Sequence, residues 1–242
     1  AHCALHAHSR NSPPFLPRCH ISTDDHIRGW KRAKEATSSG ISVLHFRMCK
    51  AHTKHYWLAE PDASQRSLAY ATGFSYPRWK FGLDVQLLKR ARDFRAEKTR
   101  LIKLMEADFN MNNKVIGVDA MKAGERYGAL SRDNYGGRKK HRSAEVGMNM
   151  TLTNNSMWAR RSRIVIMSND AKGCYDRIAH VVVNMALRRL GIPKPALQSM
   201  LETIQEMTNY IRTAFGQSTV SYGNEPNATP AQGIMQGNGA GP

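Results

Sequence analysis

The chain has 242 residues, enough for one large domain or two small ones. It carries 36 Lys and Arg against 19 Asp and Glu, a formal net charge of +17, which indicates a polyanionic partner and favours nucleic acid. No apolar run approaches the ~18 residues that a membrane-spanning helix needs, so a membrane partner is not expected.

Residues 1–22 are predicted to be a disordered or linker leader. A zinc site can be drawn through their Cys and His residues, but the spacings match no Cys-x-x-Cys pattern, so a polar leader is the favoured interpretation. We find no apolar signal-peptide core and expect an intracellular protein, with the nucleus as a candidate compartment. The Cys and His cluster consists of Cys3, His6, His8, Cys19, His20 and His26.

Residues 23–74 are predicted to form a helical N-terminal region. Thr23 and Asp25 can cap a first helix, which should end before Gly40. A short strand or a loop follows it. Pro61 is expected to open a second helix that Gly73 closes, because proline suits the first turn and glycine the C-terminal end.

Residues 75–160 are predicted to contain a β-hairpin followed by two helices. The hairpin strands, 85–89 and 100–105, nearly alternate apolar and basic residues, which indicates a sheet with a positive face. The helices are expected at 107–123 and 144–152, separated by a glycine-hinged basic turn at 135–143.

Residues 161–242 begin with a β-branched run at 163–167 that predicts a buried strand ending at Asp170. Helices at 175–190 and 194–207 and a strand at 210–215 should follow it. Strands separated by long helices predict a mixed α+β fold with helices packed on a small sheet.

The turn after Asp170 has a pattern suited to binding a metal ion that holds a polyphosphate. A carboxylate at a strand end can bind a hard cation, and the backbone amides of Gly173 and Cys174 can face phosphate oxygens. The competing interpretation is an ordinary strand–turn–helix unit in which Asp170 only caps the helix.

Two motifs in this region resemble those of reverse transcriptases, especially the non-LTR, LINE-like retrotransposon type. The first is a strand-borne Asp followed five residues later by an aromatic residue and then Asp. The second is a Gly-x-x-Gln-Gly-x-x-x-x-Pro loop. In this chain the first motif matches Asp170, Tyr175 and Asp176, and the second matches Gly233, Gln236, Gly237 and Pro242.

The resemblance implies the fingers of a right-hand polymerase at 75–160 and a partial palm at 161–242, cut within the Gln-Gly motif. It implies an RNA template, a DNA primer, a dNTP and two Mg²⁺ ions. Asp170 would be the catalytic metal ligand, and Tyr175 would exclude a 2′-hydroxyl. Gln236 and Gly237 would lie near the nucleotide, beside Gly173 and Cys174. In the fingers, Arg100 and Lys114 would contact the nucleotide. Arg138 and Lys139 lie in a turn similar to one of the family and would contact nucleic acid.

The paired Asp residues of the family would lie beyond Pro242, so the chain is expected to be a fragment that does not polymerise on its own. An alternative function is a non-catalytic basic nucleic-acid-binding protein. Under that alternative Tyr175 is a core aromatic residue, the glycine-rich loop is only flexible, and Arg138 and Lys139 belong to a solvated basic face.

Overall fold

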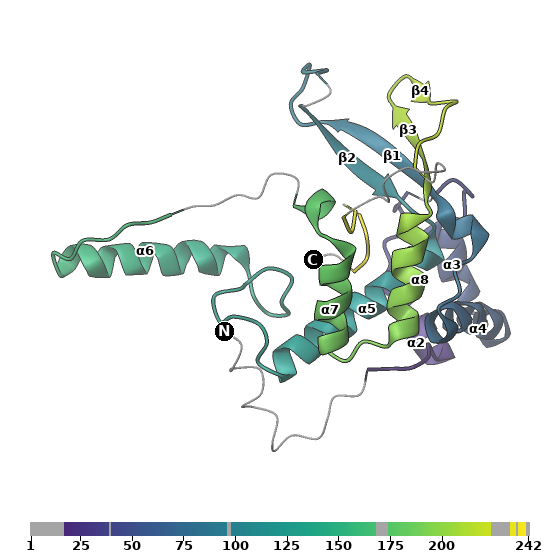
Figure 1. Cartoon of the computed structure of the whole chain (residues 1–242), viewed down its shortest axis with the longest axis horizontal. Helices are drawn as coiled ribbons and strands as arrows, with labels where there is room; N and C mark the ends of the chain where they lie inside the picture. The colour runs from purple at the N-terminus through teal and green to yellow at the C-terminus, as the bar shows by residue number, and fades with distance from the viewer. Residues whose placement is uncertain are drawn as a thin grey trace.

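The computed structural model describes residues 17–38, 40–95, 98–167, 174–223, 233–235 and 237–240. Within these ranges the chain is a mixed α+β protein, as the sequence predicts, and it has seven α-helices and a four-stranded mixed sheet (Figure 1). The helices are α2 (Thr23–Lys31), α3 (Phe46–His52), α4 (Tyr56–Thr72), α5 (Ala107–Arg126), α6 (Ser143–Ala159), α7 (His180–Arg189) and α8 (Lys194–Gln205). The strands are β1 (Phe81–Leu88), β2 (Thr99–Leu104), β3 (Thr208–Thr213) and β4 (Gly216–Gln217), and two 3-10 turns are η1 (Pro77–Lys80) and η3 (Tyr175–Arg177).

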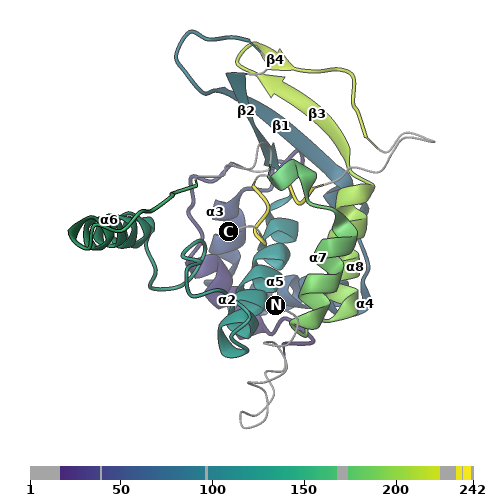
Figure 2. The same cartoon turned by 60° about the vertical axis from the view of Figure 1, so that its left-hand side comes forward.

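The sheet has the strand order β2-β1-β3-β4. The predicted hairpin is confirmed: β1 and β2 pair antiparallel, with Val85 opposite Ile102. β3 joins β1 in parallel, with Tyr210 beside Leu83. This pairing needs a long crossover connection, which the intervening helices provide. In Figure 2 the sheet lies above α5, α7 and α8, so its lower end reaches the helical layer.

The main hydrophobic core lies where α5, α8 and η1 meet. Its largest fully buried side chains include Trp79, Phe109, Ile116 and Ile204, and Met235 enters it from the C-terminal end of the chain. A second cluster fills the space between α2, α3 and the start of α5. Its members are Trp30, Ala33, Phe46, Cys49, Ala107 and Met111.

Most of the predicted helices are confirmed, because their apolar periodicity is long and local. Gly73 ends α4 with a φ of 84°, and its backbone N–H donates to the carbonyl of Ala69 over 3.1 Å. The predicted start of that helix is wrong. α4 begins at Tyr56 and continues through Pro61, because the buried Ala59 and Ala63 hold both sides of the proline against neighbouring helices.

The predicted strand at 163–167 is wrong. These residues form no strand and are exposed, with Val165 at 86% and Met167 at 83% exposure. The apolar run alone could not show whether a strand partner would be present. Asp170 itself lies outside the described residues. The strand that was predicted to lead into it is absent at 163–167.

The predicted helix at 175–190 is split into η3 and α7, with Ile178 and Ala179 extended between them. The backbone carbonyls of Tyr175 and Ile178 accept hydrogen bonds from Ile234 and Gly233. These carbonyls are therefore committed to another segment of the chain, and the α-helix starts only at His180.

α6 extends away from the rest of the molecule, and none of its residues is buried (Figure 1). Among the described residues, no helix combines the length and apolar character needed to cross a membrane.

Candidate functional site

The C-terminal loop 233–240 contacts the turn that follows the predicted metal motif. Gly233 N–H donates to the carbonyl of Ile178 over 3.0 Å, and Ile234 N–H donates to the carbonyl of Tyr175 over 2.9 Å. Gly233 has a φ of 88°, and a Cβ there would overlap the Tyr175 carbonyl and lie 2.7 Å from Cα of Asp176. Only glycine fits at this contact without moving the backbone.

The buried His180 at the start of α7 fixes the same contact. The side-chain amide of Gln205 donates to Nδ1 of His180 over 3.0 Å, so Nε2 carries the ring hydrogen. This Nε2 donates to the carbonyl of Gly233 over 2.7 Å. α7 and α8 thus both orient the loop through one imidazole.

The other end of the loop lies against β2 and the first turns of α5. Asn110 holds it with both side-chain atoms: Nδ2 donates to the carbonyl of Gly237 over 3.1 Å, and Oδ1 accepts from Gly239 N–H. Gly237 has a φ of 110°, and a Cβ there would lie 2.6 Å from the carbonyl oxygen of Lys103. The loop therefore joins three segments that are far apart in sequence, and Figure 2 shows it between α5 and α7. We call the contact of loop 233–240 with the turn 175–178, with Lys103 of β2 and with Asn110 of α5 the junction.

A buried polar cluster lies on the sheet beside this junction. Asp84 on β1 and Lys103 on β2 are opposite each other in the hairpin, and their charged groups are 3.0 Å apart. Lys103 Nζ also donates to Oδ1 of Asn209 over 2.5 Å. The hydroxyl of Tyr222 donates to Oδ2 of Asp84. The predicted positive face of the hairpin is thus wrong at this position, since Lys103 is held inside.

The electrostatics of the cluster connect it to the predicted palm motif. Burial lowers the pKa of Lys103, while the carboxylates of Asp84 and Asp176 oppose that shift. Burial also raises the pKa of Tyr222, and Asp84 and Asp176 raise it further. Asp176 therefore lies close enough to act electrostatically on both groups.

Four of the sequence-predicted residues meet at or beside this junction. Tyr175 is partly buried and accepts from the loop, Cys174 is exposed next to it, and Gly237 is in the loop itself. Lys114 on α5 has an exposed side chain, and its backbone nitrogen would be 3.0 Å from a Cβ at Gly239.

Three other predicted residues, Asp170, Gly173 and Gln236, lie outside the described residues.

The remaining predicted residues lie elsewhere. Arg100 is exposed on β2, opposite Leu87. Arg138 makes four hydrogen bonds within the chain, two to the carboxylate of Glu125 and two to the carbonyls of Ser131 and Asn134. Its guanidinium thus holds the 131–138 loop onto the end of α5, which gives it a structural role that the sequence did not predict.

Lys139, its neighbour, is exposed.

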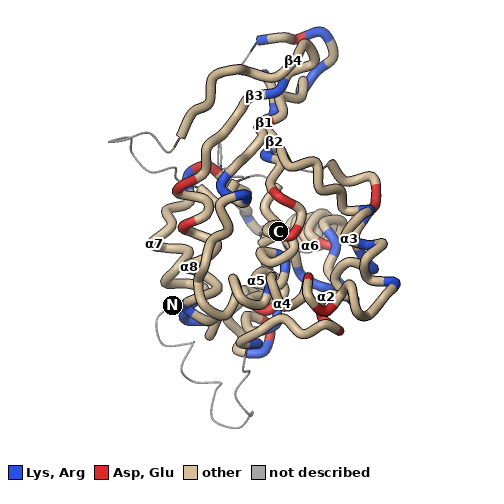
Figure 3. Tube along the Cα trace, turned by 90° about the vertical axis from the view of Figure 1, so that its right-hand side faces the viewer, with Lys and Arg blue, Asp and Glu red and all other residues tan. Residues whose placement is uncertain are grey.

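The tip of the β1–β2 hairpin is a basic surface with an exposed aromatic ring. We call it the hairpin tip and define it as residues 89–95. Phe94 there is 70% exposed, and Arg95 pairs with Asp93 over 2.9 Å. Figure 3 marks Lys and Arg positions in blue along the chain at the top of the molecule, where this turn lies. The exposed cationic residues in and beside it are Lys89, Arg90, Arg92, Arg95 and Lys98.

The described residues do not by themselves fit a magnesium site. Within them, no group of three His, Cys, Asp or Glu side chains could hold a metal ion. Asp84, the buried carboxylate beside the junction, is already bonded to Lys103 and Tyr222. The predicted Mg²⁺ sites therefore depend on Asp170, which lies outside the described residues.

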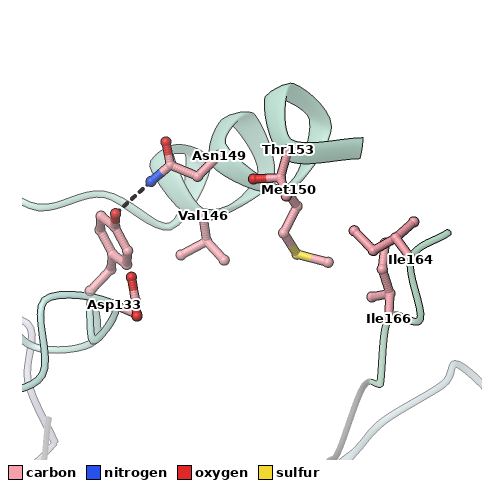
Figure 4. A pocket seen from close by; sticks show the side chains of 8 residues that line it. Asp133, Val146, Asn149, Met150, Thr153, Ile164 and Ile166 are labelled. Carbon is pink, nitrogen blue, oxygen red and sulfur yellow. Dashed lines mark hydrogen bonds between the residues drawn. The ribbon is translucent and has the colours of Figure 1, made fainter. Parts of the chain in front are cut away.

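A cavity lies beside α6, away from the junction. Its walls are mainly apolar, with Val146 and Met150 from the helix facing Ile164 and Ile166, and Asn149 bonded to Tyr135 at its edge (Figure 4). It offers one carboxylate, Asp133, and no cationic side chain, so it does not suit a phosphate-bearing ligand.

Sequence reasoning missed the residues that hold the junction together. Asn110 lies within a helix that was correctly predicted, but only the folded chain shows which loop it meets. His180 was expected inside a continuous helix. Asp84 and Lys103 could have been found, because opposite charges at facing hairpin positions indicate a cross-strand pair.

Comparison with protein-family models and with curated proteins finds no match to this chain.

Proposed function

We propose that this chain is part of an RNA-directed DNA polymerase of reverse-transcriptase type, in which the junction binds the incoming nucleotide. One observation carries the proposal. The Tyr175–Asp176 turn, the Gly233–Ala240 loop and the start of α5 are in direct contact, and these are three segments that the motif resemblance associates with one nucleotide site.

The chemistry of the junction agrees with a phosphate-bearing ligand. Glycines at 233, 237 and 239 let the loop backbone pack directly against the backbone of Tyr175, Lys103 and Asn110, which fixes the loop beside the turn that the resemblance assigns to the nucleotide. Lys114 is exposed beside the loop and can face a triphosphate. Tyr175 would limit space at the sugar and so disfavour a 2′-hydroxyl.

The hairpin tip supports the nucleic-acid part of the proposal. Exposed arginines can neutralise template phosphates, and the ring of Phe94 can stack on an unpaired base. The same surface would serve a non-catalytic nucleic-acid-binding protein, the second candidate function. The two candidates differ in whether a nucleotide binds at the junction.

Photo-cross-linking tests the proposal. The chain is mixed with an RNA–DNA hybrid, Mg²⁺ and a dTTP analogue with a photoreactive base, and the cross-linked peptides are mapped by mass spectrometry. We expect cross-links in the peptides that contain Tyr175 or residues 233–240, and dTTP should compete better than UTP. Cross-links confined to the hairpin tip, displaced equally by any polyanion, would favour the non-catalytic candidate instead.

Two variants sharpen this experiment. Tyr175→Ala should reduce the advantage of dTTP over UTP while the cross-link remains, because only the steric exclusion of the 2′-hydroxyl is removed. Asp170→Ala should remove the Mg²⁺ dependence of the cross-link and leave hybrid binding unchanged, since it removes a metal ligand but none of the basic surface.

A further inference from the structure

A second polar site lies among the N-terminal helices, away from the junction. A partly open cavity of about 70 Å³ lies between α2, α3, α4 and α5. Its walls include His26 and Trp30 from α2, Arg66 from α4, and the side chains of Asp62, Arg78 and Asp108. A volume of this size exceeds that needed for one water molecule and suits a ligand of a few heavy atoms.

Arg66 is a buried cation in this wall. Its side chain is 3% exposed, and its guanidinium donates to Oδ1 of Asn112 over 2.8 Å and to Nδ1 of His26 over 3.1 Å. It also lies 5.9 Å from the centre of the Trp30 ring. Burial lowers the pKa of Arg66 to about 10, and the charges of Asp108 and Asp62 oppose that shift. Neither of the two hydrogen-bond partners is a carboxylate, so a negatively charged acceptor placed directly against the guanidinium would stabilise it further.

Two further groups in the wall are donors without a partner in the described part of the chain. Since Nδ1 of His26 accepts from Arg66, the ring hydrogen must be on Nε2. This Nε2 and the indole Nε1 of Trp30 are buried and have no hydrogen-bond partner among the described residues. Burial and the charge of Arg66 lower the pKa of His26 to about 4, so the ring is neutral near pH 7. A ligand that pairs with these two donors must therefore supply hydrogen-bond acceptors.

The carboxylates in the wall limit the charge of that acceptor. Asp62 is bonded to Nδ1 of His52 over 2.8 Å, and Asp108 accepts both terminal nitrogens of Arg78. Both carboxylates therefore already have partners of their own, but their negative charges would oppose a doubly charged ligand such as phosphate. A singly charged anion is the better match.

We propose that this cavity binds a small, singly charged oxyanion of the size of formate, nitrate or bicarbonate. Its oxygens accept hydrogen bonds from His26 Nε2 and Trp30 Nε1, and its charge balances the guanidinium of Arg66. The site uses none of the residues of the junction and does not depend on the proposed polymerase function. A bound anion would join α2 to α4 and stabilise the N-terminal helices.

An NMR titration of the wild-type chain tests the site directly. Sodium formate replaces sodium gluconate at constant ionic strength, and the four indole N–H signals are followed. The Trp30 signal is assigned with Trp30→Phe, and Trp158, which is 86% exposed, serves as an internal control. We expect a saturable shift of Trp30 alone. A shift that rises linearly with formate, or that Trp158 shares, would mean that the cavity holds only water.

Thermal unfolding gives an independent measurement. Formate should raise Tm of the wild-type chain at constant ionic strength, and Trp30→Phe should weaken the apparent affinity by about tenfold, because one hydrogen bond to the anion is lost. Trp158→Phe should respond to formate as the wild type does. An unchanged formate response in Trp30→Phe would overturn the proposed contacts.

Discussion

Replacing Gly233 with alanine should detach the 233–240 loop from the turn at Tyr175–Ile178. The added Cβ would overlap the carbonyl oxygen of Tyr175 and lie 2.7 Å from Cα of Asp176, and both obstacles are backbone atoms that cannot rotate away. The φ of 88° is also strained for alanine, which costs on the order of 1–3 kcal/mol.

That energy would be released by local opening of the loop without unfolding of the core. Opening breaks the bonds from Gly233 and Ile234 to Ile178 and Tyr175, and each contributes roughly 0.5–1.5 kcal/mol in the wild type. Destabilising the closed loop by 1–3 kcal/mol should speed hydrogen exchange at the Ile234 amide by roughly 5- to 150-fold. The same variant should lose the nucleotide cross-link at Tyr175 and keep its affinity for nucleic acid.

Hydrogen exchange measured by NMR checks this prediction, and Gly147→Ala is the matched control. A Cβ at Gly147, within the exposed α6, would meet nothing within 4 Å. That control should leave exchange at Ile234 unchanged and stabilise the helix by roughly 0.5–1 kcal/mol. An Ile234 amide that exchanges equally slowly in Gly233→Ala and in the wild type would refute the described loop contact.

Three further predictions concern stability and binding. Lys103→Met should lower the free energy of unfolding, measured by urea denaturation, by about 3–5 kcal/mol, because it leaves Asp84 buried without its cation. Adding Asp84→Leu should recover most of this loss. A loss below about 1 kcal/mol would contradict a buried pair. Unfolded His26 gains a proton near pH 6.5 and the folded residue only near pH 4, so its contribution to stability is present above pH 6.5 and is lost as pH falls toward 4. The free energy of unfolding should therefore fall by roughly 3 kcal/mol more across this window in the wild type than in His26→Gln, and equal pH profiles would disprove burial of the neutral ring. Phe94→Ala should weaken binding of single-stranded RNA, measured by fluorescence anisotropy, by about 1–3 kcal/mol without changing the salt dependence. Phe215→Ala, which removes an even more exposed ring at the β3–β4 turn, should have no effect.

Local signals in the sequence predicted much of the fold. The β1–β2 hairpin, α5 and α8 follow from alternation or helical periodicity within single segments, and the end of α4 follows from Gly73. The parallel pairing of β1 with β3 could not be predicted, because it joins segments separated by the four helices α5, α6, α7 and α8 and is decided by packing. At 163–167 a strand was predicted from strong β propensity, but the residues form none.

The site was predicted less completely than the fold. Motif resemblance pointed to Tyr175 and to the glycine loop, which do contact each other. It could not identify Asn110 or His180, because their roles depend on which backbone atoms meet in the folded chain. It also assigned Arg138 to nucleic acid, whereas the hydrogen bonds of its guanidinium go to Glu125 and to loop carbonyls.

The most direct test of the central claim is to map nucleotide binding on the ¹⁵N-labelled chain. dTTP with Mg²⁺ is added at constant ionic strength, and inorganic triphosphate is added in a parallel titration. If the junction binds nucleotide, dTTP should give saturable shifts of the Asp176, Ile234 and Asn238 amides that triphosphate alone does not reproduce. Shifts confined to the hairpin tip, and equal for dTTP and triphosphate, would contradict a nucleotide site at the junction.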